Sequence, residues 1–293
     1  MRAKVRGTEL YFDVEGAELE PAGLDMRRKP VLVALHGGPG GDHSGFKPAF
    51  SALADKAQII YLDHRGSGRS ARGPRETYTL ENNVEDLEAF RQYLGLETFG
   101  LIGVSYGGMV ALSYAARYNH NLSHLLLVVT AASHRFIDRA KEILAERGTP
   151  EQQAVARRLW DGEFESEEQL REYFEVLGPI YSLTFDLAKE RERRCIYSID
   201  AINEGYSGFL RDYDVTDQLG KITSPTLVIG GRHDWICAPE FSEEITDGIP
   251  GAQLRMFEHS GHTVYTDEPE AFTDVVRGWL TYTPRPRKGN DPR

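Results

Sequence analysis

A serine in the first half of the chain has the neighbours that a nucleophile needs. Gly103-Val104-Ser105-Tyr106-Gly107 lies between two apolar runs, FGLIG and MVALSYAA. This context predicts a strand, a tight turn and a helix, with the Ser105 hydroxyl at the helix N-terminus, where a developing anion is stabilised. Gly103 and Gly107 avoid side-chain clashes in such a turn. The alternative is an ordinary glycine-rich turn in which Ser105 caps the helix.

Two residues further along the chain could supply a base and its orienting partner. Asp234 ends the apolar run TLVIGGRHD, so we expect its carboxylate at the carboxyl edge of a sheet. His262 follows the short strand-like run LRMF. The order Ser105, Asp234, His262 predicts a catalytic triad, in which the imidazole accepts the hydroxyl proton and the carboxylate orients the imidazole. His259 is a rival base, and we expect it to be structural.

Two loops follow apolar runs in the same way. The segment HGGPG at 36–40 comes after VLVAL, and its glycines allow a backbone amide to approach a reacting carbonyl closely. Phosphate binding is disfavoured there, because no G-x-G-x-x-G spacing occurs and Pro39 lacks an amide hydrogen. The segment DHRGSGRS at 63–70 could form a wall of an active-site floor, but we expect a charged loop that anchors neighbouring turns.

The elements that must position these residues alternate along the chain. A hairpin of edge strands is expected in the first twenty residues. Continuous apolar runs are typical of strands buried on both faces, and they are separated by helical stretches, a succession that predicts a mostly parallel sheet between helices. The runs lie at 31–41, 58–70, 99–108, 125–132 and 226–234, and the helical stretches at 81–95, 109–118 and 270–280.

One segment interrupts this alternation. Residues 133–220 are rich in Glu and Arg, have helical periodicity and contain no convincing buried strand. We therefore expect a helical cap inserted between core segments 1–132 and 221–282, with most of its aromatic residues in its own core and one helical stretch at 188–202. The tail 283–293 is rich in proline and charge, and we expect it to be disordered.

Composition argues against several classes of protein. The net charge of −11 disfavours nucleic-acid binding, which needs a basic face. No apolar run approaches the ~18 residues of a membrane span, and none follows the basic N-terminus as in a secretory signal. The two cysteines, Cys195 and Cys237, fit a reducing compartment, so we expect a cytoplasmic protein. The histidine pairs 120/124 and 259/262 lack a convincing third ligand, so no metal site is expected.

Taken together, HGGPG at 36–40, DHRGSGRS at 63–70 and GVSYGG at 103–108 resemble the α/β-hydrolase superfamily, in particular the proline iminopeptidase family. The resemblance implies an α/β-hydrolase fold with a helical cap, and cleavage of an N-terminal residue, usually proline, from a peptide. It also implies that the amides of Gly38 and Tyr106 form the oxyanion hole.

The chain departs from this family at a position that bears on the substrate. The family's exopeptidases typically hold the free amine with acidic side chains, one directly after the triad aspartate and others from the cap. Here Trp235 follows Asp234, so that carboxylate is missing. Glu204, in the cap stretch AINEGYSGF, is a candidate for a remaining amine anchor, and a surface glutamate is the equal alternative. A pocket without such a group would suit neutral esters or lactones better.

The sequence thus predicts a serine hydrolase that forms an acyl-enzyme on small peptides, with a carboxylesterase or lactonase as the alternative. A third hypothesis, a hydrolase-fold receptor, is disfavoured by the intact triad and both oxyanion segments. The serine at position 105 argues against epoxide hydrolase and haloalkane dehalogenase chemistry, for which relatives use an aspartate there. No cofactor, nucleic acid or membrane is expected as a partner, and the oligomeric state stays open.

Overall fold

The computed structural model describes residues 1–281, and its centre is an eight-stranded sheet with the order β1-β2-β6-β5-β7-β8-β9-β10. Neighbouring strands from β6 to β10 run parallel, whereas β1 and β2 add an antiparallel hairpin at one edge. The predicted mostly parallel sheet and the N-terminal hairpin are therefore confirmed. The strands are β1 (Arg2–Val5), β2 (Thr8–Glu15), β5 (Val31–Leu35), β6 (Gln58–Leu62), β7 (Phe99–Val104), β8 (Leu122–Val128), β9 (Thr226–Gly231) and β10 (Gln253–Phe257).

Helices cover both faces of the sheet, which explains why the central strands are apolar at every position. In β5, Val31, Val33 and Leu35 belong to one buried cluster, while Leu32 and Ala34 belong to another on the opposite face. The first face packs against α1 (Leu80–Tyr93), α2 (Tyr106–Tyr118) and α8 (Pro239–Gly248). The second packs against α9 (Val264–Asp267) and α10 (Pro269–Thr281), together with the short 3-10 turns at 43–46 and 50–53.

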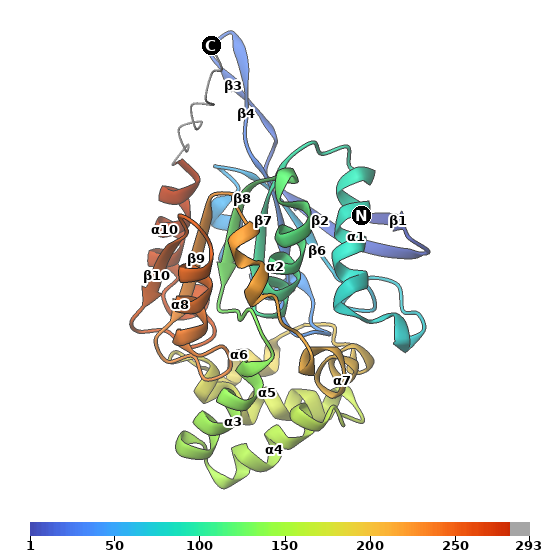
Figure 1. Cartoon of the computed structure of the whole chain (residues 1–293), viewed down its shortest axis with the longest axis vertical. Coiled ribbons are helices and arrows are strands. Elements are labelled where there is room, and N and C mark those ends of the chain that lie inside the picture. The colour runs from blue at the N-terminus through green and yellow to red at the C-terminus, as the bar shows by residue number, and fades with distance from the viewer. Residues whose placement is uncertain (282–293) are drawn as a thin grey trace.

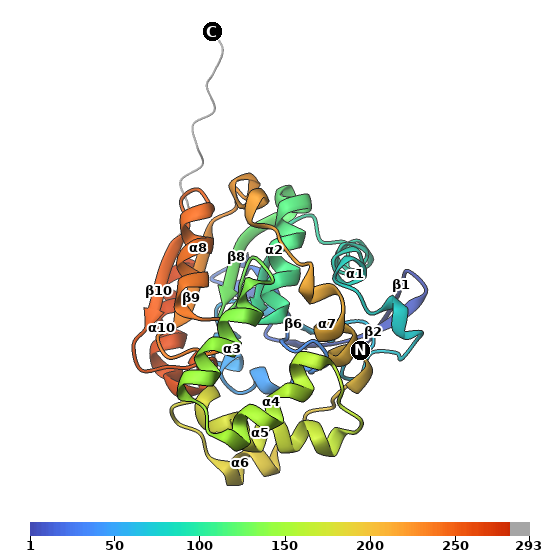
Figure 2. The ribbon, with the colours of Figure 1, turned by 60° about the horizontal axis from the view of Figure 1, so that its bottom comes forward.

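A separate group of helices lies beyond one end of the sheet (Figures 1 and 2). These are α3 (Arg135–Arg147), α4 (Pro150–Asp161), α5 (Glu167–Tyr181), α6 (Leu187–Glu192) and α7 (Ile199–Ser207). They fall within the segment for which the sequence predicts helices. They face the loops that follow β5 and β7, because side chains from both groups line one cavity. For brevity, residues 133–220 are called the cap below.

One helical prediction within the cap is wrong. The stretch 188–202 is not continuous, since α6 ends at Glu192 and α7 begins at Ile199. The backbone between them pairs with a loop of the sheet: the Ile196 amide donates to Asp42 Oδ2 at 3.1 Å and the Ser198 amide to the Gly40 carbonyl at 2.8 Å. These tertiary bonds replace the helical ones, and Ser198 then caps α7 through its side chain.

A second hairpin was not expected from the sequence. Strands β3 (Leu19–Ala22) and β4 (Asp25–Arg28) pair antiparallel and project from the end of the molecule opposite the cap helices (Figure 1). The predicted disordered tail at 283–293 lies outside the described residues. Within residues 1–281, no helix is long and apolar enough to cross a membrane.

Candidate active site

The turn between β7 and α2 presents Ser105 in a strained conformation. Its backbone has φ 54° and ψ −121°, values that residues with a side chain rarely adopt. A Cβ atom at Gly107 would lie 2.2 Å from the Leu35 carbonyl oxygen, and one at Gly103 would lie 2.5 Å from the Gly107 oxygen. Glycine is therefore required at both positions, as predicted. Ser105 lies directly before α2, whose first amides have no acceptor within the helix.

The structure brings the three predicted triad residues into one hydrogen-bonded chain. Ser105 Oγ lies 3.0 Å from His262 Nε2, and His262 Nδ1 lies 2.7 Å from Asp234 Oδ2. The other oxygen of Asp234 accepts bonds from the amides of Ile236 and Cys237, at 2.9 and 3.0 Å. Asp234 is fully buried, so its two oxygens are held by protein donors alone. This arrangement can transfer the Ser105 proton to a fixed imidazole.

The position of His262 also depends on the cap. Its backbone amide donates to the carbonyl of Tyr181, the last residue of α5, at 2.7 Å. A Cβ atom at Gly261 would lie 2.4 Å from the same carbonyl oxygen, so only glycine allows this close approach. The Tyr181 ring meets the imidazole edge to face at 5.6 Å. Nothing in the sequence around Tyr181 marks it as the residue that holds the histidine loop.

The glycine segment after β5 runs directly past the serine. A Cβ atom at Gly37 would lie 3.1 Å from Ser105 Cβ, and Gly38 has a φ of 124°, which favours glycine. Gly38 thus lies on a segment that passes close to Ser105, and the Tyr106 amide belongs to the residue directly after it at the start of α2. The Tyr106 side chain points elsewhere, because its buried hydroxyl accepts a bond from Asn83 Nδ2 at 2.6 Å.

Two buried histidines fix the backbone on either side of this segment. His36 Nδ1 donates to the Gly37 carbonyl at 2.8 Å, and His36 Nε2 accepts from the His64 amide at 3.1 Å. Burial lowers the pKa of His36, and it lowers the pKa of His64 well below its ordinary value. Both rings are therefore neutral at pH 7 and act as structural hydrogen-bonding groups.

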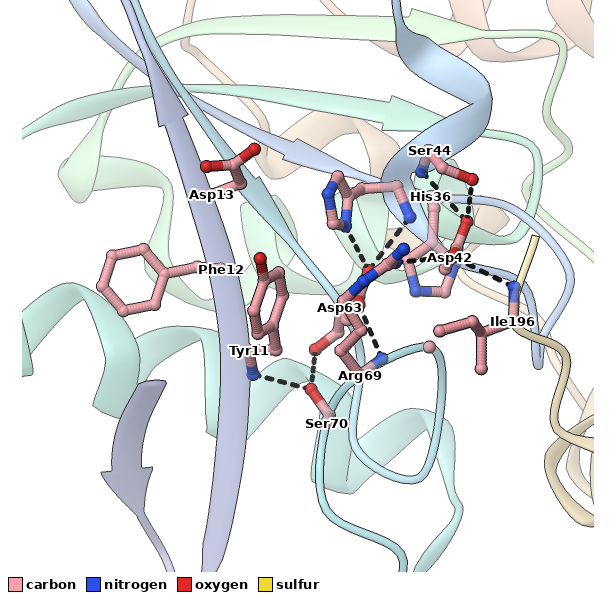
Figure 3. Close-up of polar contacts among 12 residues, drawn as sticks. Tyr11, Phe12, Asp13, His36, Asp42, Ser44, Asp63, Arg69, Ser70 and Ile196 are labelled. Atoms are coloured by element: carbon pink, nitrogen blue, oxygen red, sulfur yellow. Dashed lines mark hydrogen bonds and ion pairs between the residues drawn. The ribbon is translucent and has the colours of Figure 1, made fainter. Parts of the chain in front are cut away.

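The loop DHRGSGRS anchors its neighbours, which was the favoured interpretation. Asp63 is fully buried and accepts bonds from the His43 ring at 2.7 Å, the His43 amide at 2.9 Å and the Arg69 amide at 2.8 Å (Figure 3). Burial opposes its ionisation, but the bonds and the neighbouring histidines hold the pKa of Asp63 below the usual range. This carboxylate ties the loop after β6 to the loop after β5.

Asp42 extends the same network to the cap, a role that sequence analysis missed. Its carboxylate accepts bonds from Ser44, from Arg69 Nη1 at 2.8 Å and from the Ile196 amide at 3.1 Å, and Figure 3 shows Ile196 reaching it from the cap. Burial raises its pKa, yet these bonds outweigh burial and lower the pKa of Asp42 to about 2. Asp42 is thus an ionised link between the sheet and the segment that separates α6 from α7.

Ser105 and His262 open into a cavity of about 880 Å³. One wall consists of the loops after β5, β7, β9 and β10, and the cap supplies the other. Six of the cap aromatics also line this cavity: Tyr173, Phe174, Tyr181, Phe185, Tyr197 and Tyr206. Three of them, Tyr173, Tyr197 and Tyr206, are at the same time buried members of the main core cluster, as predicted for most of the cap aromatics. Ionisable cap residues also line it, namely Asp186, Lys189, Glu190, Glu192, Arg193 and Arg194.

The two predicted substrate-binding residues do not reach this cavity. Glu204 lies on α7 and forms an ion pair with Arg75 at 3.1 Å, away from the cavity lining. Trp235 is 1% exposed and packs edge to face against Trp160 and Tyr181, 6.0 and 5.3 Å between ring centres. Trp235 is therefore part of the packing beneath the cavity wall, and Glu204 belongs to a surface ion pair.

Other nucleophilic or metal-binding groups do not compete with this site. His259 is exposed and its ring takes no part in the triad. Within the described part of the chain, no group of three His, Cys, Asp or Glu side chains could hold a metal ion. Burial raises the pKa of the Cys195 thiol to about 12 and that of Cys237 well above its ordinary value. Neither cysteine is a thiolate at neutral pH.

Comparison with known proteins agrees with this geometry. A sequence model described as the alpha/beta hydrolase fold matches residues 30–269. The proline iminopeptidase PfmaB of Pestalotiopsis fici is 34% identical over 92% of this chain and 98% of its own. A proline iminopeptidase of Lactobacillus helveticus is 32% identical over 94% of this chain and 95% of its own.

A solved structure shows the same fold. The proline iminopeptidase of Mycobacterium smegmatis superposes with a TM-score of 0.74 at 24% identity, covering 96% of this chain and 97% of that one. The sheet order and the cap helices agree with the family match. This chain belongs to the α/β-hydrolase fold family, in its proline iminopeptidase branch, and is a serine-type hydrolase.

Proposed function

We propose that the protein is a proline-iminopeptidase-like aminopeptidase that releases the N-terminal residue of small peptides through an acyl-enzyme. The observation that carries the proposal is the unbroken chain from Asp234 through His262 to Ser105, which ends in a cavity enclosed by the cap. The relatives named proline iminopeptidase support the choice of peptide as substrate.

Acylation follows from the positions of these groups. His262 Nε2 accepts the Ser105 proton as the hydroxyl attacks the carbonyl of the N-terminal residue, and the buried Asp234 carboxylate stabilises the imidazolium. The amides of Gly38 and Tyr106 donate to the oxyanion of the tetrahedral intermediate. His262 then protonates the leaving amine, and the carbon–nitrogen bond breaks.

Deacylation repeats the same steps with water as the nucleophile. His262 removes a proton from the water as it attacks the ester carbonyl, and it returns a proton to Ser105 as the amino acid leaves. The strained backbone of Ser105 and the glycines around it hold the ester next to the oxyanion donors through both halves of the reaction.

The cavity also contains a candidate for the amine anchor. Glu190 lines it, and its side chain is only 19% exposed, whereas Glu204 lies outside. A partly buried carboxylate favours a substrate ammonium group over an acetylated amine, because acetylation removes the positive charge and leaves Glu190 with only its 3.6 Å ion pair to Arg193. We therefore propose Glu190 as the amine anchor, a role for which Glu204 was only a candidate beside the equal alternative of a surface glutamate.

The test compares proline p-nitroanilide with its N-acetylated form. We expect kcat/KM to be larger for the free amine by about 10- to 100-fold, the size of a charge-assisted hydrogen-bonded pair, because acetylation removes the charge that Glu190 would pair with. Glu190→Gln should remove most of this preference, and the matched control Glu204→Gln should keep it. Equal cleavage of both anilides by the wild-type protein would contradict an aminopeptidase.

The cavity also suits an esterase in one respect. Trp235 occupies the position directly after the triad aspartate, where the family's exopeptidases typically have an acidic residue, and aromatic side chains contribute to the cavity wall. Rapid hydrolysis of p-nitrophenyl butyrate, with both anilides left intact, would favour the carboxylesterase or lactonase alternative.

A further inference from the structure

Arg193 places a guanidinium group inside the cavity that holds Ser105. It lies in the extended stretch between α6 and α7, lines the cavity, and has a side chain 38% exposed. A Cβ atom at Gly45 would lie 3.1 Å from Arg193 Nη2, so the group reaches across to the loop after β5. Its guanidinium carbon lies 5.8 Å from the centre of the Phe174 ring.

This guanidinium is hardly used by the protein itself. Within residues 1–281 its side chain makes no hydrogen bond, and its one ion pair, with Glu190, is long at 3.6 Å. The neighbouring Arg191 differs, because it donates to Glu175 at 3.0 and 2.9 Å. A guanidinium carries five N–H donors in a planar fork that matches a carboxylate. Arg193 thus offers these donors to whatever fills the cavity.

A purely architectural role does not explain the arrangement. The stretch around Arg193 is already held by the Ile196 amide on Asp42 and the Ser198 amide on Gly40. Neither bond involves the Arg193 side chain. The Arg193 side chain is 38% exposed, and its ion pair with Glu190 at 3.6 Å is longer than a hydrogen bond, so its N–H donors remain available to a ligand in the cavity.

Glu190 and Arg193 together present opposite charges side by side to the cavity. We infer that the cavity selects zwitterionic short peptides, with the free C-terminal carboxylate of a dipeptide paired to Arg193 while the ammonium group faces Glu190. This inference rests on the proposed aminopeptidase activity. The chemistry that Arg193 recognises is a substrate carboxylate, and the dipeptide places it on the leaving group.

The test measures kcat/KM for prolyl-glycine and prolyl-glycinamide, which differ only in the carboxylate. We expect the wild-type protein to prefer the free acid by about 10- to 100-fold, the size of a charge-assisted hydrogen-bonded pair. Arg193→Gln should reduce this preference to near unity, and Arg193→Lys should restore part of it. The control Arg191→Gln removes a surface charge two residues away and should keep the wild-type ratio.

A second substrate pair identifies the source of the carboxylate. p-Nitrophenyl hemisuccinate carries a carboxylate on its acyl group, whereas p-nitrophenyl butyrate has an acyl group of similar length without one. If Arg193→Gln lowers the rate only for the hemisuccinate, the carboxylate belongs to the acyl group and the dipeptide inference is overturned. An unchanged acid-to-amide ratio in Arg193→Gln, with circular dichroism like that of the wild type, overturns it as well.

A binding experiment distinguishes failure of the proposed peptidase activity from failure of the carboxylate site. If no prolyl peptide is cleaved, binding of prolyl-glycine and its amide to the Ser105→Ala protein is measured by calorimetry. Tighter binding of the free acid that is lost in the Ser105→Ala, Arg193→Gln double variant supports the carboxylate site without peptidase activity. Equal binding of acid and amide overturns it.

Discussion

The two walls of the cavity are built in different ways. One wall, called the floor here, consists of the turns that follow β5, β7, β9 and β10, and close backbone contacts require glycine at several of their positions, such as Gly103, Gly107 and Gly261. The roof consists of cap side chains whose backbone is held by distant partners, such as Asp42 for Ile196. The reacting groups therefore lie on turns whose place in the chain the local sequence marks, although the His262 turn is also held by Tyr181 of the cap. The cap groups that face the substrate lie on segments whose geometry is determined by tertiary contacts.

The largest effect is expected from the floor. Ser105→Ala removes the nucleophile and should reduce kcat/KM by about 10⁴-fold or more, with a midpoint of thermal unfolding close to that of the wild type. Labelling by a fluorophosphonate probe should disappear as well. His259→Ala, which changes the exposed rival histidine, should leave both readouts unaltered. Substantial activity in Ser105→Ala would rule out the acyl-enzyme mechanism.

The glycine positions of the floor provide the next test. An alanine at Gly107 would place its Cβ 2.2 Å from the Leu35 carbonyl oxygen. The Cβ is fixed to the Gly107 backbone and the oxygen belongs to the Leu35 backbone, so neither atom can move without moving the main chain. We expect Gly107→Ala to lower the free energy of unfolding by about 3 kcal/mol, in the upper range of overpacking effects. Gly220→Ala meets no atom within 4 Å and serves as the control in urea unfolding. Equal midpoints for the two variants would show that the turn tolerates a side chain.

Asp42 tests the connection between floor and roof. Its folded-state pKa of about 2 is lower than the ~3.9 of an unfolded chain, so its ionised form stabilises the fold above about pH 4. This stabilisation, about 2 kcal/mol, is lost as the pH falls from about 4 towards 2. Asp42→Asn should therefore lower stability at pH 7 and differ little from the wild type near pH 2.

Urea unfolding at several pH values measures this difference, and Asp138→Asn, on a side chain that is 81% exposed, is the control. Because Asp42 also holds the Ile196 amide, KM for prolyl-glycine should rise more than kcat falls. A destabilisation that is the same at pH 2 and pH 7 would mean that the ionised carboxylate is not the source.

The contrast between floor and roof also explains which parts of the structure could be predicted from the sequence. The continuous apolar runs and the glycines around Ser105 predict both the parallel sheet and the meeting of Ser105, Asp234 and His262, because each residue follows the end of its strand within five positions. Nothing local marks Tyr181 as a partner of His262, or Asp42 as a partner of Ile196, since 154 positions separate the latter pair. The same reason explains why helical periodicity at 188–202 predicts a helix that the structure interrupts.

The smallest effect is expected at Trp235. Its position directly after the triad aspartate and its place in the structure suggest different roles. The position suggests a substrate contact, but the side chain is 1% exposed, and its indole nitrogen has no hydrogen-bond partner within the described chain. Trp235→Phe removes no hydrogen bond and keeps an aromatic ring against Tyr181. We expect a loss of stability of about 1 kcal/mol and less than about a threefold change in kcat/KM for proline p-nitroanilide. A change in the preference between free and acetylated anilide would instead show that position 235 shapes the substrate pocket. The residue directly after Asp234 would then belong to the groups that face the substrate.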